Sequence, residues 1–315
     1  MATILVTGAT GFIGKALVMH LVEQGFTVRA MVRETLPTQR GIEYFVADIT
    51  SSDKLDSACR NVDCVIHLAG RAHVIHETVG SPLEAFRRVN VEGTLRLARA
   101  AASVGVPRFI FVSSIGVNGD KTDTALFDEN SPALPHADYA KSKLEAEQGL
   151  IDLCSQHLME WVIVRPPMVI DSQAPGNFAR LLRLVNRALP LPFGLARNRR
   201  SLVSLRNLVD LLTQSIAHPA AANEIFLAAD GDDVSTAEMV RALAQGMERP
   251  ARLIPVSPGL LLVLFSIIKR HRLYNQLYGS LQVDAGKARR LLDWKPREST
   301  TEALRRIGAE YRQRL

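Results

Sequence analysis

The first half of the chain alternates short apolar runs with longer helical patterns, and this alternation limits its possible folds more than any other feature. The runs are rich in β-branched and aromatic residues, which is typical of buried strands. The expected strands are Thr3–Thr7, Thr27–Val32, Glu43–Ala47, Cys64–His67, Phe109–Ser113 and Trp161–Arg165. Helical patterns lie between them, for example Phe12–Glu23, Val89–Ser103 and Tyr139–His157. We therefore expect an α/β fold with a doubly wound parallel sheet, whose ligands bind at the carboxyl ends of the strands.

The first expected strand leads directly into the glycine-rich stretch G-A-T-G-F-I-G. Its glycines, Gly8, Gly11 and Gly14, stand at i, i+3 and i+6, which differs from the G-x-G-x-x-G spacing of the dinucleotide fingerprint. The physical role can be the same, because a glycine turn before a helix presents free N–H groups to a pyrophosphate. The place of the stretch between a strand and an amphipathic helix predicts a nucleotide site. The alternative is an ordinary tight turn.

Two further stretches could carry chemistry. In Tyr139-Ala-Lys-Ser-Lys143 the tyrosine and the second lysine are four residues apart and share a helix face. A nearby ammonium favours the phenolate, so we expect a lowered pKa for Tyr139 and proton exchange with a substrate hydroxyl. Ser114 ends the strand F-I-F-V-S-S, where it could hydrogen-bond the reacting oxygen. The alternatives are a solvated helix face and a hydroxyl that caps a loop.

The 315-residue chain is long enough for two lobes. The regular alternation ends after Arg165, where prolines become frequent, and we expect a smaller, mostly C-terminal α/β substrate lobe. The dinucleotide-binding domain is predicted at 1–165 plus about 201–228. The substrate domain is predicted at about 166–200 plus 229–315.

The composition limits the classes of partner that the protein is expected to bind. The formal net charge is +6, but aromatic residues are only 6% and do not interleave with the basic ones, which argues against nucleic acid. A basic pocket for a phosphorylated small molecule explains the excess of positive charge better.

Cys59, Cys64 and Cys154 lack metal-type spacing, so we expect no metal site and a reducing, cytoplasmic location. Met1 leads directly into the first strand, and we expect no secretory signal.

The longest apolar run, Gly259–Ile268, is about half of the ~20 residues that a membrane-spanning helix needs. We therefore expect no integral membrane segment. The run is expected to form a buried helix. The basic residues K-R-H-R follow at once, and they leave contact with a membrane interface open as the alternative.

Taken together, these motifs resemble those of the extended short-chain dehydrogenase/reductases, the NAD-dependent epimerase/dehydratase family. The resemblance covers nearly the whole chain and rests on T-G-A-T-G-F-I-G, H-L-A-G, S-S-I-G-V-N-G, Y-A-K-S-K and R-P-P-M-V, with later segments like those of nucleotide-sugar members. It implies a Rossmann sheet with a substrate lobe. It also implies a homodimer formed through the helices around Val89–Ser103 and Tyr139–His157.

The resemblance also implies roles for individual residues. Catalysis is assigned to Ser114, Tyr139 and Lys143. Cofactor contacts are assigned to Gly8, Thr10, Gly11, Phe12, Ile13, Gly14, Arg33, Asp48, Ile49, Leu68, Ala69, Gly70, Asn90, Tyr139, Lys143 and Pro166. Substrate contacts are assigned to Ser114, Asn177 and Arg200. Three of these have plainer alternatives: a helix cap for Asp48, a helix N-cap for Asn90 and a surface charge for Arg200.

The end of the second expected strand bears on the choice of cofactor. An acidic residue there would accept the ribose 2′-OH of NAD, but Val32 and Arg33 occupy these positions and Glu34 follows. An arginine can pair with a 2′-phosphate, so we expect NADP or NAD, with NADP slightly preferred. Alternatively, Arg33 points to solvent.

The expected reaction is oxidoreduction at C4 of a nucleotide sugar, of the type that serves bacterial surface polysaccharide. The first interpretation is an NAD(P)-dependent reductase of a UDP-4-keto-6-deoxy-N-acetylhexosamine. The alternative is a UDP-sugar 4-epimerase of the UDP-glucose or UDP-N-acetylglucosamine type. Two further alternatives are a reductase of a non-sugar ketone and a non-catalytic NAD(P)-binding sensor, although a sensor would have no need of an intact Ser-Tyr-Lys set.

Overall fold

The computed structural model describes residues 1–51, 53–72, 81–267 and 271–314. Its centre is a parallel sheet with the strand order β3-β2-β1-β4-β5-β6-β9. The strands are β1 (Thr3–Thr7), β2 (Thr27–Val32), β3 (Ile42–Val46), β4 (Cys64–His67), β5 (Arg108–Val112), β6 (Glu160–Arg165) and β9 (Glu224–Leu227). The order reverses between β1 and β4, and ligands of such sheets bind at this point. The predicted fold class is therefore confirmed: a doubly wound, Rossmann-type α/β fold.

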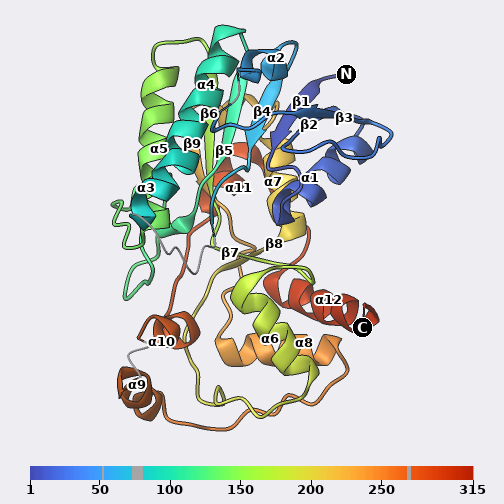
Figure 1. Ribbon diagram of the computed structural model, residues 1–315. Coiled ribbons are helices and arrows are strands. Elements are labelled where there is room, and N and C mark those ends of the chain that lie inside the picture. The colour runs from blue at the N-terminus through green and yellow to red at the C-terminus, as the bar shows by residue number, and fades with distance from the viewer. Residues whose placement is uncertain (52, 73–80, 268–270, 315) are drawn as a thin grey trace.

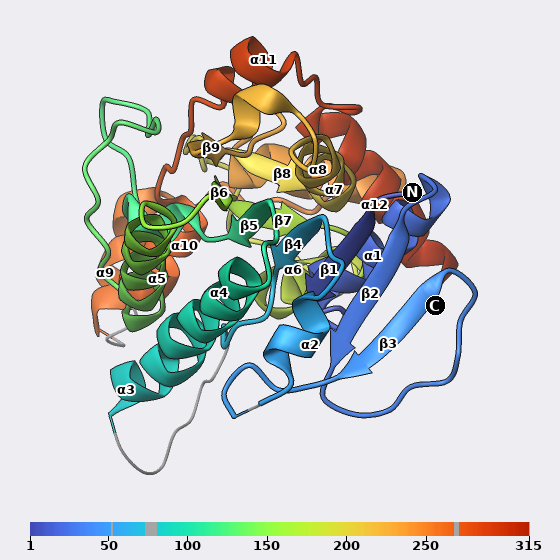
Figure 2. The same cartoon turned by 90° about the horizontal axis from the view of Figure 1, so that it is seen from above.

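Helices cover both faces of this sheet (Figures 1 and 2). The core on one face includes residues of α1 (Phe12–Glu23), α7 (Leu205–Gln214) and α11 (Gly286–Leu292). The core on the other face includes residues of α2 (Leu55–Cys59), α4 (Thr94–Ser103) and α5 (Asp138–Cys154). Because both faces are covered, the central strands read as continuous apolar runs and do not alternate with polar residues.

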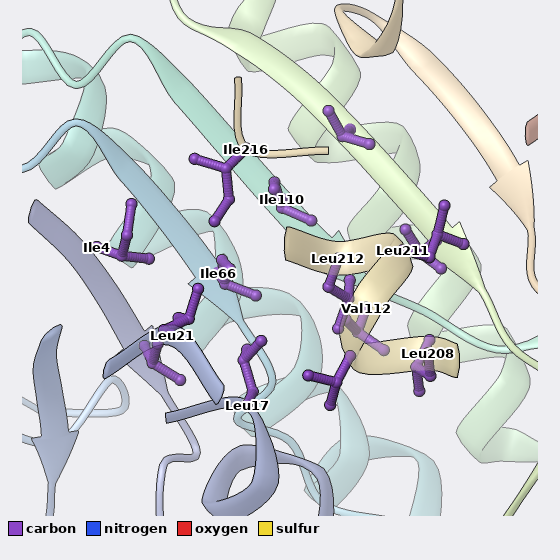
Figure 3. Close-up of a cluster of buried hydrophobic side chains, with 14 of the residues drawn as sticks. Ile4, Leu17, Leu21, Ile66, Ile110, Val112, Leu208, Leu211, Leu212 and Ile216 are labelled. Carbon is purple, nitrogen blue, oxygen red and sulfur yellow. The ribbon is translucent and has the colours of Figure 1, made fainter. Parts of the chain in front are cut away.

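Figure 3 shows part of the first core, where aliphatic side chains of the sheet meet those of α1 and α7. Its labelled members are Ile4, Leu17, Leu21, Ile66, Ile110, Val112, Leu208, Leu211, Leu212 and Ile216, all buried. Each buried side chain of this size contributes roughly 1.5–3 kcal/mol relative to its exposed state. This packing holds strands that are distant in sequence in one rigid frame.

A second group of elements lies below the sheet in Figure 1. It contains the parallel pair β7 (Met168–Ile170) and β8 (Leu202–Ser204), with α6 (Gly176–Asn186), α8 (Thr236–Gly246) and α12 (Thr300–Gln313) around a core of their own. Helices α9 (Pro258–Ile267) and α10 (His271–Tyr278) stand at its edge. The division into two domains stays a prediction. Ala288, Leu292 and Trp294, near the C-terminus, pack into the sheet core of the first lobe.

The helix expected at Val89–Ser103 has a more complex form. The chain enters through α3 (Pro82–Phe86), widens into the π-helix η1 (Arg87–Gly93), and only then continues as α4. At the junction the Thr94 hydroxyl donates a hydrogen bond of 2.7 Å to the carbonyl of Asn90. π-helical segments inside α-helices are frequent at functional sites. Elsewhere, short 3-10 turns lie at η2 (Ile115–Val117) and η3 (Pro219–Ala221). Within the described ranges, no helix is long and apolar enough to cross a membrane.

Two glycines of the first turn are required by backbone packing. Gly8 has a φ of +66°, and a Cβ there would lie 2.7 Å from the amide nitrogen of Ala69. A Cβ at Gly14 would collide with the carbonyl oxygen of Gly8. Both contacts are with backbone, which cannot move aside as a flexible side chain can. The turn and the first turn of α1 therefore lie against each other and against the end of β4.

We predict that Gly14→Ala lowers the free energy of unfolding by about 3 kcal/mol, because the added methyl group must push two backbone segments apart. Urea unfolding followed by circular dichroism would measure the change. Gly259→Ala is a matched control, since the nearest atom to a Cβ at that glycine is 3.8 Å away. Equal unfolding midpoints for Gly14→Ala and the unsubstituted protein would contradict the packing argument.

Candidate active site

Two cavities open at the carboxyl ends of the sheet strands and share part of their lining. One has a volume of about 700 Å³ and the other about 540 Å³. Gly8, Gly11, Leu68 and Gly70 line both, so the cavities meet at the glycine turn. The larger extends toward the ends of β2 and β3, and the smaller extends toward α5 and α6. An elongated ligand can cross the turn from one cavity to the other.

Gly11 has the surroundings expected for a phosphate cradle. It is the N-cap of α1, and its own amide donates a hydrogen bond of 2.9 Å to the Gly8 carbonyl. A Cβ at this position would meet only that carbonyl oxygen, at 3.1 Å, and would otherwise enter the shared cavity. The first amides of α1 have no partner within the helix and carry its positive dipole end. The turn therefore fits the pyrophosphate of a dinucleotide.

The smaller cavity brings together the three predicted catalytic residues. Ser114 lies just after β5, and its Oγ accepts a hydrogen bond of 3.1 Å from the amide of Gly116. Tyr139 lies in the first turn of α5, edge-on to Phe86 with ring centroids 6.1 Å apart. Lys143 follows one helical turn later. All three line the same 540 Å³ cavity, although 25 residues separate the serine from the tyrosine in the sequence.

Lys143 is held in a buried position. Its Nζ donates a hydrogen bond of 2.9 Å to the carbonyl of Val112 at the end of β5. The same Nζ lies 4.4 Å from the centre of the Phe111 ring, within the range of a cation–π contact. Burial lowers the pKa of Lys143 to about 8, and the negative charge of Glu147 partly opposes this. The ammonium is therefore fixed beside the end of β5, the strand that leads to Ser114.

The pKa of Tyr139 differs from the prediction. Burial raises the pKa of its phenol to about 12, where the sequence predicted a lowered value. The expectation considered only the attraction between the phenolate and the Lys143 ammonium. In the structure the ammonium donates to the Val112 carbonyl, and the loss of solvation around the phenol dominates.

Asn90 lies behind the cavities and does not line either of them. Its side chain accepts a hydrogen bond of 2.7 Å from the Arg71 amide and donates to the Arg71 carbonyl and to Ser142 Oγ. The Ser142 hydroxyl in turn donates to the carbonyl of Tyr139 at 2.7 Å. Asn90 therefore ties the loop after β4 to the first turn of α5. A direct cofactor contact of Asn90 stays a prediction.

A second buried network, missed by the sequence reasoning, holds α5 against the sheet. Arg165, at the end of β6, forms a double hydrogen bond with Glu147 of α5, with distances of 2.5 and 3.0 Å. It also donates to the amide oxygen of Asn118, which lies just after η2. All three side chains are buried. An arginine and a glutamate this far apart in sequence carry no local signal of their pairing.

His67, in the H-L-A-G motif, is likewise structural. Its Nδ1 lies 2.6 Å from the Thr7 hydroxyl, which also accepts a hydrogen bond from the Ala69 amide. Its Nε2 lies 2.9 Å from Thr94 Oγ1, whose proton goes to the Asn90 carbonyl. Nε2 therefore carries a proton and donates to Thr94, and in the neutral ring Nδ1 accepts from the Thr7 hydroxyl. Burial, reinforced by the charge of Lys143, lowers the pKa of His67 to about 3.

Charged side chains line the end of the larger cavity near β2 and β3. Arg33 follows β2, and Asp48 follows β3. Asp48 Oδ1 accepts two hydrogen bonds of 2.7 Å from Thr50, and these lower the pKa of its carboxyl group. Arg88 of η1, which the sequence did not single out, also lines this end. Arg33 and Arg88 are both exposed, and their positive charges lower the pKa of Asp48 further.

The remaining predicted residues divide between the cavities and the second lobe. With Asn90 set aside, every predicted cofactor residue lines one or both cavities: Gly8, Thr10, Gly11, Phe12, Ile13, Gly14, Arg33, Asp48, Ile49, Leu68, Ala69, Gly70, Tyr139, Lys143 and Pro166. Asn177 lines the smaller one and donates a hydrogen bond of 2.8 Å to Gln276 of α10. Arg200 is not among the lining residues, and its guanidinium donates to the carbonyl of Gly279. Its role as a substrate contact stays a prediction.

The fold and these joined cavities define the class: a Rossmann-type α/β protein with a dinucleotide-sized site at the switch point of its sheet. Comparisons with known proteins agree. The description "NAD dependent epimerase/dehydratase family" belongs to a family model that matches residues 4–229. Over 314 residues the chain is 40% identical to the UDP-glucose 4-epimerase of Vibrio cholerae, covering 99% of this chain and 96% of that protein.

Two further similarities are more distant. One is to the N-acetyl-alpha-D-glucosaminyl-diphospho-ditrans,octacis-undecaprenol 4-epimerase of Escherichia coli O157:H7, with 27% identity over 82% of this chain and 77% of that protein. The other is to the structure of MoeE5 in complex with UDP-glucuronic acid and NAD, with a TM-score of 0.80, 25% identity and full coverage of both chains. The chain belongs to the NAD dependent epimerase/dehydratase family and is an enzyme of the short-chain dehydrogenase/reductase type.

We predict that Tyr139→Phe lowers turnover at least ~10²-fold, because the substitution removes only the hydroxyl that exchanges a proton with the substrate. Affinity for the dinucleotide, measured by calorimetry, is expected to stay within about twofold, since the ring still packs against Phe86. Tyr311→Phe in α12 is the matched control. A Tyr139→Phe enzyme with turnover near that of the control would rule out this residue as the acid/base group.

Proposed function

We propose that the protein is an NAD-dependent 4-epimerase of a UDP-linked sugar. The observation that carries the proposal is the convergence of Ser114, Tyr139 and Lys143 on one cavity that joins the dinucleotide-sized cavity at the glycine turn. The 40% identity with a UDP-glucose 4-epimerase over nearly the full length supports the same reaction. The resemblance to UDP-sugar enzymes supports a nucleotide sugar as the substrate.

The chain's own residues would divide the work as follows. The glycine turn and the N-terminus of α1 would hold the pyrophosphate, and the end with Asp48 would hold the adenosine. When bound, the nicotinamide supplies hydride acceptance and hydride donation. As the phenolate, Tyr139 would accept the proton of the C4 hydroxyl as the sugar is oxidised, and the resulting phenol would return it as the 4-keto sugar is reduced. Ser114 Oγ would hydrogen-bond the same oxygen, and the Lys143 ammonium would stabilise negative charge that develops on it.

Epimerisation makes one further demand on the site. The 4-keto sugar must present its opposite face before reduction, so the wall around it has to permit rotation. The smaller cavity provides about 540 Å³ and is lined there by Pro167, Met168, Val169 and Phe178. These mostly apolar side chains offer few hydrogen bonds that would fix one orientation of the ring.

A specific observation favours a second candidate, an NADPH-dependent 4-ketoreductase acting on a UDP-4-keto-6-deoxy-N-acetylhexosamine. Arg33 and Arg88 line the adenosine end of the larger cavity together, where a 2′-phosphate would lie. Guanidinium groups match phosphate oxygens with two hydrogen bonds each. A reductase exchanges its cofactor in every cycle and draws on the reduced pool, for which NADPH suits. An epimerase gains more from a tightly held NAD.

The arginine pair yields a prediction for cofactor choice. If the pair binds a 2′-phosphate, Arg33→Ala combined with Arg88→Ala weakens NADPH binding by about tenfold or more, the loss expected from a charge-assisted hydrogen bond. NAD affinity is expected to change little, because NAD has no phosphate at that position. Arg241→Ala on α8, far from the cavities, controls for the loss of a positive charge. Unchanged NADPH affinity in the double variant would remove the support for NADP.

The purified protein itself separates the two reactions. For the epimerase we expect NAD to be released on denaturation, and we expect UDP-glucose or UDP-N-acetylglucosamine to be converted to its C4 epimer without added cofactor. Two further substrates should be tested: the UDP-linked 4-keto-6-deoxy sugar together with NADPH, and a diphospho-undecaprenol-linked N-acetylglucosamine. Protein free of cofactor that consumes NADPH only with the 4-keto sugar would overturn the epimerase in favour of the reductase. A homodimer formed through α4 and α5 and a cytoplasmic location stay predictions.

A further inference from the structure

Helix α9 exposes apolar side chains that the sequence predicted to be buried. Its sequence is P-G-L-L-L-V-L-F-S-I, and a helix that is apolar all round is normally enclosed by other elements. Leu260 is 65% exposed, Val263 57% and Ile267 73%. These three residues recur at i, i+3 and i+7 and therefore lie along one side of the helix. The prediction of a buried helix is wrong for this side.

The reason lies in the position of α9. Figure 1 shows α9 at the lower edge of the second lobe, beside α10 and away from the seven-stranded sheet. It packs against α10, where the rings of Phe265 and Tyr274 have centroids 6.1 Å apart. Leu261 is buried. No other part of the described chain covers the side formed by Leu260, Val263 and Ile267.

The exposed apolar surface continues beyond α9. Two extended segments, 189–195 and 252–255, lie side by side through hydrogen bonds of 2.8 Å between Leu191 and its partners Arg252 and Ile254. The second segment leads into α9 along the lower edge of Figure 1. These segments add exposed leucine and isoleucine side chains. We call the whole set the α9 surface: Leu189, Leu195, Ile254, Leu260, Leu262, Val263 and Ile267.

The chain segments that form the α9 surface carry charge of one sign. The stretches 172–209 and 249–283, which supply all of it, contain no aspartate or glutamate. The first stretch has seven arginines and the second has five lysines and arginines. Of these, Arg183, Arg187, Arg197 and Arg252 are exposed. Lys269 and Arg270, in the basic run after α9, lie outside the described residues. An apolar face in acid-free, basic surroundings complements a surface with an apolar interior and negatively charged headgroups.

We propose that the α9 surface docks onto an anionic phospholipid bilayer, with α9 lying in the interface. The helix has ten residues, half of what a span requires, but enough to lie along the headgroup boundary. A second copy of the chain fits less well, because a symmetric contact would bring the two sets of arginines together. The proposal does not depend on which sugar reaction the enzyme performs.

Docking at this surface would place the catalytic cavity near the bilayer. Asn177 lines that cavity and bonds to Gln276 of α10, the helix against which α9 packs. The α6 edge of the cavity and the α9 surface are therefore linked through one short helix. The seven-stranded sheet and the adenosine end of the site would remain on the side away from the lipid (Figure 1).

The test is flotation of the full-length protein with vesicles of phosphatidylcholine alone or with phosphatidylglycerol. We expect binding to the anionic vesicles that weakens as salt is raised, and little binding to phosphatidylcholine alone. Leu260→Gln combined with Val263→Gln should lower the partition coefficient by about tenfold, since two exposed apolar side chains no longer enter the interface. Leu134→Gln combined with Leu158→Gln is the matched control, because both leucines are exposed and neither belongs to the α9 surface.

Three results would overturn the proposal. The first is no flotation with anionic vesicles at low salt. The second is equal flotation of the α9 variant and the control. The third is a concentration-dependent oligomer, seen by sedimentation, that only the α9 variant loses, which would mean that a second copy covers the surface. Thermal unfolding and turnover of a soluble UDP-sugar are expected to be the same in both variants, so a folding defect or a wrong reaction assignment would be recognised separately.

Discussion

The close approach of backbone at the glycine turn is the constraint from which the site is built. A Cβ at Gly8 would lie 2.7 Å from the Ala69 amide nitrogen, so no side chain fits between the ends of β1 and β4, and a Cβ at Gly14 would lie still closer to the Gly8 carbonyl. β1 and β4 are paired neighbours at the switch point of the sheet, and the glycine turn after β1 places the N-terminus of α1 beside the shared cavity. The His67 hydrogen-bond chain, which runs from Ala69 through Thr7 to the ring, fixes the same junction from inside. A ligand pocket at this place follows from how the backbone packs.

Helix α5 reaches the same junction through buried polar contacts. The Arg165–Glu147 pair ties its middle to β6, and the bond from Lys143 to Val112 ties its first turns to β5. A buried ion pair of this kind adds little net stability, but removing one partner would leave an uncompensated charge. Asn90 completes the frame by joining Ser142 to the loop after β4. Of the residues that position the tyrosine and the lysine, Val112 lines the cavity with them, whereas Asn90, Glu147 and Arg165 do not.

Much of this architecture was predictable, because it depends on local patterns. The bounds of β1, β2, β4 and α1 match the expectations, since each is a clean apolar or amphipathic run that ends at a glycine or a polar residue. The cavity lining was predictable where motif residues adjoin strand ends. The π turn at Asn90, the Arg165–Glu147 pair and Arg88 were not, because each depends on contacts across the fold. The exposure of α9 could not be predicted from its sequence. An apolar helix is expected to be covered, but its composition does not show whether the covering surface belongs to the same chain.

The pair Tyr139 and Lys143 shows why a motif does not by itself fix its chemistry. The phenol has a pKa of about 12 and the ammonium a pKa of about 8, so near neutral pH both groups hold their protons, as a neutral phenol and an ammonium. Both shifts come mainly from burial, which disfavours the charged form of each group. An ammonium–phenolate pair would reverse the order of the two pKa values, and it requires Nζ to turn from the Val112 carbonyl toward the phenol oxygen. The spacing of Y-x-x-x-K therefore guarantees proximity, while the protonation state depends on the charge and solvation that a bound substrate brings into the cavity.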